Sequence, residues 1–162
     1  MIGKLWSDMS DLSIGLSITF IDRFLKKECE NYLGIFAPDT LPSQLMKNGT
    51  LVCNLSNSNQ MGSHFITIVI QERQVLYIDS FGVPCENADI NRFLDFQKKP
   101  IKHNETMIQD LVSDFCGFFC ILFCMYYDVS RNEPLLFFSD LSKNDNHCIR
   151  LILLLKRNKQ TT

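Results

Sequence analysis

The segment QDLVSDFCGFFCILFC, residues 109–124, contains three cysteines at intervals of four residues. Ser113 or Asp114 is a natural helix N-cap, so Cys116 is predicted to lie in the first turn of a helix. Unpaired backbone N–H groups and the positive end of the helix dipole favour a thiolate there, and the thiolate is the nucleophilic form of cysteine. Gly117 removes a side chain next to the sulfur, which would let another backbone or a substrate approach closely. Cys116 is therefore the candidate nucleophile.

The other cysteines show neither a metal-binding nor a disulfide pattern. The chain has seven cysteines and no C-x-x-C pair, which argues against a zinc ribbon or a thioredoxin-type motif. Ligands at Cys116, Cys120 and Cys124 would be spread over ~12 Å of helix, too far apart for one tetrahedral ion. We therefore predict no metal site, and we predict that Cys120 and Cys124 are buried core residues.

His64 and Asp79 are predicted to meet across a β-hairpin. Two runs rich in β-branched residues, 64–70 and 75–81, are separated by the polar sequence QERQ. If the turn is tight, residue 66 lies opposite Asp79, and His64 is the diagonal neighbour of Asp79 at roughly 7–8 Å. A carboxylate in that position would fix the imidazole tautomer and favour its cationic form. The alternative is that His64 merely begins a strand and Asp79 belongs to a turn in DSFG.

Gln109 could add a further catalytic group, because it lies seven residues before Cys116. When a thiolate attacks a carbonyl, N–H donors can stabilise the oxyanion that forms. The Gln109 amide and the backbone N–H of Cys116 could together form such an oxyanion hole. Taken alone, this glutamine indicates little, because glutamines are common on protein surfaces.

The elements that must position these residues follow from apolar spacing and turn residues. Helices are predicted over 11–28, over 88–99 and in the C-terminal tail, with a buried strand over 49–56 ahead of the hairpin. Residues 31–45 contain a glycine and two prolines and are predicted to form a loop. Residues 114–128 are apolar on every side, which predicts a buried central helix, with a buried strand as the alternative for part of it. This order favours an α+β fold in which one sheet packs on helices.

Length and composition fit one domain over residues 1–162. The net charge of −2 gives no general attraction to nucleic acid. The apolar run IRLILLLK is much shorter than the ~20 residues that cross a bilayer. The N-terminus MIGKLWSDMS has no apolar core of a secretory signal, so an intracellular, reducing compartment is expected.

Four motifs follow one another between about residues 30 and 130: YLGIFAPDTLP, LVCNLSNSNQMGSHFITIVI, VLYIDSFGVP and IQDLVSDFCGFFCILFCMYY. In this order they resemble the adenovirus protease (adenain) family, including relatives encoded by virus-like DNA transposons and related viruses. The resemblance implies a papain-like active site in a different chain order. It also implies a mixed central sheet flanked by helices, with the nucleophile at the N-terminus of a buried central helix.

By this resemblance, Cys116 is the nucleophile, His64 the general base and then acid, and Asp79 the residue that orients the imidazole. Gln109 and the Cys116 N–H would form the oxyanion hole. Phe65 stands where the family usually has tryptophan after the histidine, and its ring is expected to pack on His64. Asp79 replaces the glutamate of the adenoviral members.

The activating cofactors of the adenoviral enzymes are not carried over. Those enzymes bind an activating peptide through a cysteine ahead of the glutamine, and the corresponding segment KKPIKHNETMIQ has none. The charge balance gives little support to a DNA cofactor. A peptide or DNA activator is thus implied by the resemblance but not by residues of this chain.

The expected function is that of a cysteine endopeptidase that cleaves capsid or other virion precursor proteins after a small residue such as glycine. A monomer is expected, in the host cytoplasm or nucleus, with packaging in virions as a further option, and neither secretion nor membrane association is expected. One alternative is a protease of ubiquitin-like modifiers, which uses the same His–Asp–Gln–Cys arrangement. Another, from a different class, is a catalytically inactive interaction module.

Overall fold

A five-stranded mixed β-sheet forms the centre of the protein. The structure is a computed structural model that describes residues 15–129 and 135–159. The outer strand pairs are parallel, whereas the three central strands run antiparallel to one another. In order across the sheet, the strands are β1 (Tyr32–Phe36), β2 (Gly49–Asn54), β3 (Phe65–Ile70), β4 (Val75–Ile78) and β5 (Ile101–His103).

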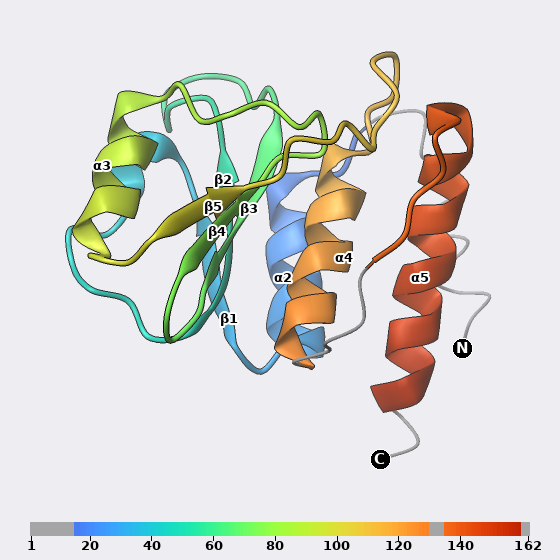
Figure 1. Cartoon of the computed structure of the whole chain (residues 1–162), viewed down its shortest axis with the longest axis horizontal. Helices are drawn as coiled ribbons and strands as arrows, with labels where there is room; N and C mark the ends of the chain where they lie inside the picture. The colour runs from blue at the N-terminus through green and yellow to red at the C-terminus, as the bar shows by residue number, and fades with distance from the viewer. Residues whose placement is uncertain (1–14, 130–134, 160–162) are drawn as a thin grey trace.

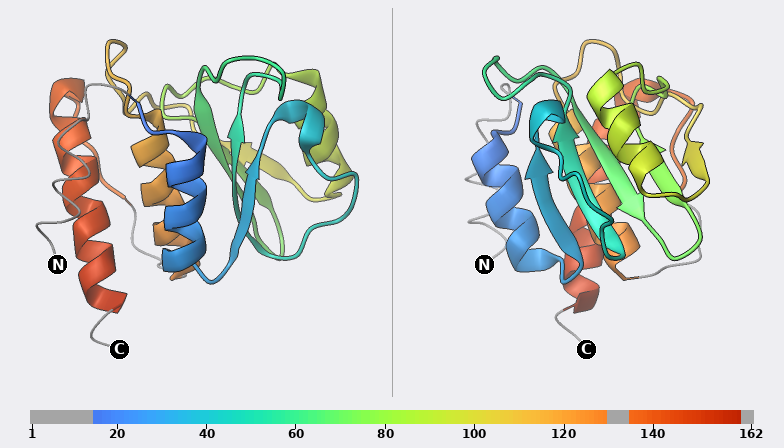
Figure 2. Two further views of the ribbon diagram at one scale, coloured as in Figure 1. Left: turned by 180° about the vertical axis from the view of Figure 1, so that it is seen from behind. Right: turned by 90° about the vertical axis from the view of Figure 1, so that its left-hand side faces the viewer.

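Helices cover both faces of this sheet (Figure 1). α2 (Ile18–Glu28) and α4 (Cys116–Asp128) lie side by side on one face, and α5 (Asn144–Lys159) forms a further layer outside α4 (Figure 2). α3 (Ala88–Phe96) covers the opposite face. The predicted α+β class is confirmed. Among the described residues, no helix has both the length and the apolar character needed to cross a membrane.

The β3–β4 hairpin has the register predicted from the sequence. Thr67 lies opposite Ile78, and the Gln71 N–H donates to the carbonyl of Gln74 at 2.9 Å, so the turn is tight. β3 begins one residue after His64, and β4 ends one residue before Asp79. All six residues of β3 are buried because both faces of the sheet are covered by helices. The hairpin therefore brings its two chemically active residues to the same end of the sheet.

The edge strands differ from the prediction. The expected loop over 31–45 contains β1, whose residues are only half-buried and whose parallel pairing with β2 is irregular near Gly34. β5 has three residues, all exposed, and its sequence IKH has no apolar alternation. Both strands are stabilised by a neighbouring strand distant in sequence, so local pattern did not predict them.

α4 is the buried central helix, and the strand alternative for this segment is wrong. Its residues 117–126 are all buried between the sheet and the other helices. The predicted N-cap is also wrong: the cap is Phe115, whose carbonyl accepts from the N–H groups of Phe118 at 2.9 Å and Phe119 at 3.1 Å. The Ser113 hydroxyl instead accepts from the Phe115 N–H at 3.3 Å, in the turn before the helix. Cys116 is the first residue of α4, so it lies in the first turn of the helix as predicted.

Cys120 and Cys124 are core residues, as predicted. Their exposed fractions are 2% and 0%, and burial raises the pKa of both thiols well above the usual range. The buried side chain of Thr67 on β3 lies near Cys120, and that of Thr50 on β2 lies near Cys124. The spacing of four residues thus places two thiols under two buried threonine hydroxyls of the sheet.

Candidate active site

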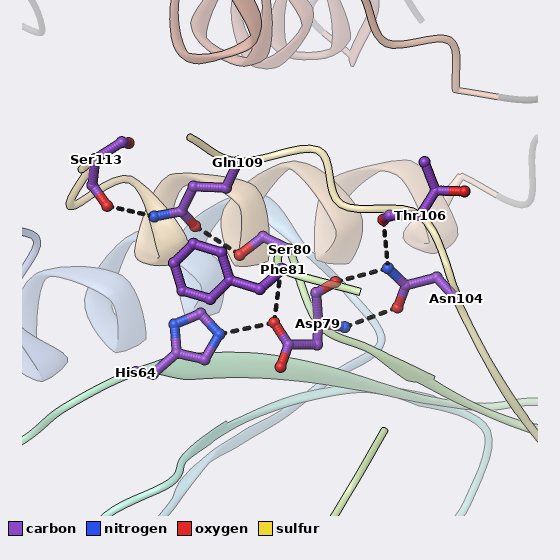
Figure 3. Close-up of polar contacts among 8 residues, drawn as sticks. All are labelled: His64, Asp79, Ser80, Phe81, Asn104, Thr106, Gln109 and Ser113. Atoms are coloured by element: carbon purple, nitrogen blue, oxygen red, sulfur yellow. Dashed lines mark hydrogen bonds and ion pairs between the residues drawn. The ribbon is translucent and has the colours of Figure 1, made fainter. Parts of the chain in front are cut away.

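His64 and Asp79 form a hydrogen-bonded pair at the open end of the hairpin. The His64 Nε2 donates to Asp79 Oδ1 at 2.8 Å (Figure 3). The same carboxylate oxygen accepts from the Phe81 N–H at 2.8 Å. The Asp79 side chain is only 4% exposed, so water competes little for either contact. The carboxylate therefore fixes both the orientation and the tautomer of the imidazole.

Asn104, directly after β5, holds the backbone of Asp79 in place. Its Nδ2 donates to the Asp79 carbonyl at 2.6 Å, and its Oδ1 accepts from the Asp79 N–H at 2.9 Å (Figure 3). The turn that follows also needs Gly82, which has a φ of +68° and approaches closely the backbone of Thr106. The acidic residue is therefore anchored from a segment 25 residues away in the chain.

The aromatic ring that stacks on His64 is Phe81, and the expectation that Phe65 would pack there is wrong. The His64 and Phe81 rings are 4.7 Å apart between centroids and inclined by 25°. Phe65 is the first residue of β3, so its side chain points to the opposite face from that of Ile66 and enters the core around α4. Phe65 instead lines the cleft next to Cys116.

The His64 imidazole has an unusually high pKa. Burial alone would lower this pKa, but hydrogen bonds to Asp79 and Cys116 and the charges of both partners outweigh it and raise it to about 9. Because Nε2 is bound to Asp79, Nδ1 is the ring nitrogen left for the Cys116 sulfur. The structure thus brings His64, Asp79 and Cys116 together, with the imidazole between carboxylate and thiol. At neutral pH this arrangement favours the imidazolium form of His64.

Gln109 is fully buried beside these residues. Its Oε1 accepts from the Ser80 hydroxyl at 2.6 Å, and its Nε2 donates to the Ser113 carbonyl at 2.5 Å (Figure 3). Its exposed fraction is 1%, so the side chain has a single environment that is set by these contacts. Gln109 therefore links the turn after Asp79 to the loop that leads into Cys116.

A cleft of about 380 Å³ opens at Cys116. Its walls are residues 15–17 ahead of α2 and Ile18 at its start, residues 62–63 ahead of β3, and Phe65 and Asp114. Four of the wall residues are glycine or serine, namely Gly15, Ser17, Gly62 and Ser63, so their side chains fill little of the cleft.

Gly117 lets another segment of the chain pack closely on α4, which is one of the two roles expected for it. A Cβ at this position would lie 3.0 Å from the Ile21 side chain and 3.1 Å from that of Leu16. The glycine thus allows close packing of α2 and the segment before it on α4, rather than close approach of a substrate. It still affects the site, because this packing positions one wall of the cleft.

No group of three or more potential metal ligands occurs among residues 15–129 and 135–159. All seven cysteines lie within these ranges, and each is a free thiol. A larger cavity of about 510 Å³ lies between β4, β5 and the second half of α4. It contains none of His64, Asp79 and Cys116, although Asn104 lines it.

Sequence reasoning missed Ser80, Phe81 and Asn104. Phe81 was part of the quoted DSFG turn, but its contact with His64 depends on turn geometry. Ser80 and Asn104 are common surface residue types, and neither has a recognisable spacing relative to its partner. Only the three-dimensional approach of 104–109 to the turn after β4 identifies them.

Comparison with solved structures shows that the fold is similar to that of the SUMO protease Ulp1. The solved structure that shows this is the SUMO protease Ulp1 with its catalytic cysteine oxidised to a sulfinic acid, at a TM-score of 0.51 and 17% identity. The match covers 87% of this chain and 78% of that one. This confirms the predicted fold class. At this identity, the likeness establishes the fold, and the activity needs a separate argument.

Two further structures are similar at lower TM-scores. Ulp1 with its cysteine oxidised to a sulfenic acid matches at a TM-score of 0.48 and 17% identity, over 86% of this chain and 77% of that one. An ASFV protease matches at 0.42 and 17% identity, over 67% of this chain and 43% of that one. No protein-family profile matches the sequence, and no curated protein matches it.

Proposed function

We propose that this protein is a cysteine endopeptidase in which Cys116 is the nucleophile. The observation that carries the proposal is the His64 imidazole, which Asp79 holds at 2.8 Å on one side and whose pKa the nearby, half-buried Cys116 helps to raise on the other. An exposed surface histidine would have neither partner. The fold adds support, because Ulp1 is a cysteine protease of the same architecture.

The chemistry follows from the placement of each group. The Cys116 thiolate attacks the scissile carbonyl carbon, and the carbonyl oxygen takes the negative charge. The Cys116 N–H, unpaired at the start of α4, and the second Nε2 hydrogen of Gln109 stabilise that oxyanion. The imidazolium gives its proton to the leaving amine as the C–N bond breaks. Water, deprotonated by the imidazole, then hydrolyses the thioester and restores the thiolate.

The proposed substrate is a capsid or virion precursor protein that is cleaved after a small residue such as glycine. The preference for a small residue rests on the resemblance of the sequence motifs to those of the adenain family. The YLGIF and DSFG segments, which resemble those of the adenain family, support the choice of a viral or virus-like precursor. The proposal extends to a monomer that acts inside the host cell and is carried in virions.

A protease of ubiquitin-like modifiers is the second candidate. It is favoured by the similarity to the SUMO protease Ulp1 over 87% of the chain. Both candidates use the same catalytic groups, so the site geometry does not separate them. The substrates differ in size, because a modifier protease recognises a folded domain in addition to the extended segment in the cleft.

A paired cleavage assay tests the two candidates. Wild-type protein and Cys116→Ala are incubated with a glycine-containing peptide from a capsid precursor and with a ubiquitin-like fusion protein. The peptide is expected to be cleaved by the wild type alone, with at least a ~10-fold higher kcat/KM than the fusion, on the usual scale of pocket discrimination. The reverse preference would favour the modifier protease. Cleavage of neither, together with slow alkylation of every thiol, would leave only the inactive interaction module.

Activity is expected to fall on the alkaline side of about pH 9, the value to which the His64 pKa is raised. Below that pH the imidazolium holds the proton that the leaving amine requires. Above it, kcat/KM should fall about tenfold per pH unit. A pH profile of peptide cleavage measures the limb, and circular dichroism at each pH checks that the fold persists. An alkaline limb near the ordinary histidine value of 6.5 would contradict the proposed pairing.

A further inference from the structure

We propose that Ser80 is a positioning residue that orients the Gln109 amide for oxyanion binding. The inference rests on the proposed function, because it concerns the oxyanion hole of that reaction. The Ser80 hydroxyl is next to Asp79 in sequence, but it hydrogen-bonds to Gln109, and its proposed role is in the oxyanion hole rather than in the His64–Asp79 pair.

The first step is that the orientation of a glutamine amide matters. Its two ends are similar in size, but Nε2 donates two hydrogen bonds and Oε1 only accepts. If the amide were flipped, Oε1 would face the developing oxyanion and repel it. An oxyanion hole that uses Gln109 therefore needs neighbours that distinguish the two ends.

The second step is that the Ser113 carbonyl and the Ser80 hydroxyl together distinguish the two ends of the Gln109 amide. The Ser113 carbonyl can only accept, so Nε2 must face it, as it does at 2.5 Å. This leaves Oε1 facing the Ser80 hydroxyl, which donates to it at 2.6 Å. One Nε2 hydrogen is used by Ser113, and the proposal assigns the other to the oxyanion. Without the Ser80 hydroxyl, Oε1 would be a buried acceptor without a partner, and the amide would no longer be held at both ends.

The third step is that the hydroxyl can be removed without removing the backbone contacts. The Ser80 carbonyl accepts from the N–H groups of Ile108 at 2.9 Å and Gln109 at 3.1 Å. These main-chain hydrogen bonds tie the two segments together whatever side chain stands at position 80. Ser80 is only 3% exposed, so a size-matched pair of substitutions is needed to isolate the hydroxyl.

Ser80→Thr and Ser80→Val form this pair, because threonine and valine have the same shape and differ in the hydroxyl. The valine variant is expected to have a kcat about 10- to 100-fold below that of the threonine variant, with KM changed less than about threefold, since loss of a whole donor costs about 10²–10³. In a Gln109→Ala background, the two variants should be equal, because Ser80 acts through Gln109. Equal kcat in the wild-type background, or an undiminished difference in the Gln109→Ala background, would overturn the inference.

Alkylation of Cys116 by iodoacetamide separates this role from an effect on His64. The alkylation forms no oxyanion, so its rate and pH profile should be the same in the threonine and valine variants. A parallel fall in alkylation would show that Ser80 acts through Asp79 and His64 instead. If the branched side chains prevent folding, Ser80→Ala, compared with wild type, gives the same readouts in a smaller side chain.

Hydrogen exchange measured without substrate tests the Ser80–Gln109 contact separately from the proposed protease function. The side-chain NH₂ of ¹⁵N-labelled Gln109 should exchange slowly with solvent in the threonine variant and faster in the valine variant. Equal exchange would overturn the Ser80–Gln109 contact, whether or not the protein cleaves peptides. Different exchange in a protein that cleaves no substrate and alkylates slowly would support the contact and refute the proposed function.

Discussion

Replacement of Cys116 by alanine is expected to lower kcat/KM for peptide cleavage by about 10⁴-fold or more, because the covalent step is lost. The fold should persist, since Cys116 is only half-buried and lies at the start of α4 rather than within its buried stretch. Steady-state kinetics on the capsid-derived peptide measures the loss. Thermal unfolding followed by circular dichroism checks that the variant remains folded.

Cys120→Ala is the matched control, one helical turn further along α4. Cys120 is 2% exposed and lies under Thr67, so its loss should reduce the free energy of unfolding by about 1–2 kcal/mol. Its kcat/KM should stay within about threefold of wild type, as expected for a residue that does not touch the reacting atoms. Equal activity in the two variants would remove Cys116 as the nucleophile.

Asp79→Asn is expected to give the second large effect. Asparagine can still accept from His64 Nε2 and from the Phe81 N–H, so the geometry is retained while the negative charge is lost. Burial then lowers the His64 pKa with one fewer opposing charge, and the alkaline limb of kcat/KM should move from about 9 toward the ordinary value of 6.5. At pH 8 the variant should therefore be about 10- to 100-fold less active than wild type.

The direction of the shift in the His64 pKa distinguishes an electrostatic role of the Asp79 carboxylate from a role in packing alone. The loss of activity should be smaller at pH 6, where His64 is protonated in both proteins, and larger at pH 8. Asp95→Asn, an exposed carboxylate on α3, is the matched control and should leave the pH profile unchanged. An Asp79→Asn variant that is impaired equally at both pH values would show that the residue acts by packing alone.

The sequence predicted those parts of the fold and of the candidate site whose geometry depends on residues close together in the chain. The tight QERQ turn and the two-residue period of β3 and β4 fix the hairpin register, so the meeting of His64 and Asp79 followed from counting residues. The buried helix followed from an apolar run too long for a strand. Cys116 in its first turn needed only the approximate start of that run.

What could not be predicted depends on segments that approach each other from far apart in the chain. β1 and β5 are strands because β2 and β4 pair with them, and their own sequences do not require it. Phe81 rather than Phe65 stacks on His64 because a turn directs its side chain, and the turn is held by Asn104. The Ser80–Gln109 contact joins residues 29 apart and has no sequence signal.

The order of the site along the chain bears on the protein's own synthesis. His64 and Asp79 leave the ribosome first, on a hairpin of short sequence separation, and the nucleophile follows later. Cys116 reaches the imidazole only when α4 has packed between the sheet and α5. A nascent chain, or one terminated early, therefore carries a base without a nucleophile. The contact between the imidazole and the thiol, unlike the His64–Asp79 pair, therefore forms only after α4 has been synthesised and has packed on the sheet.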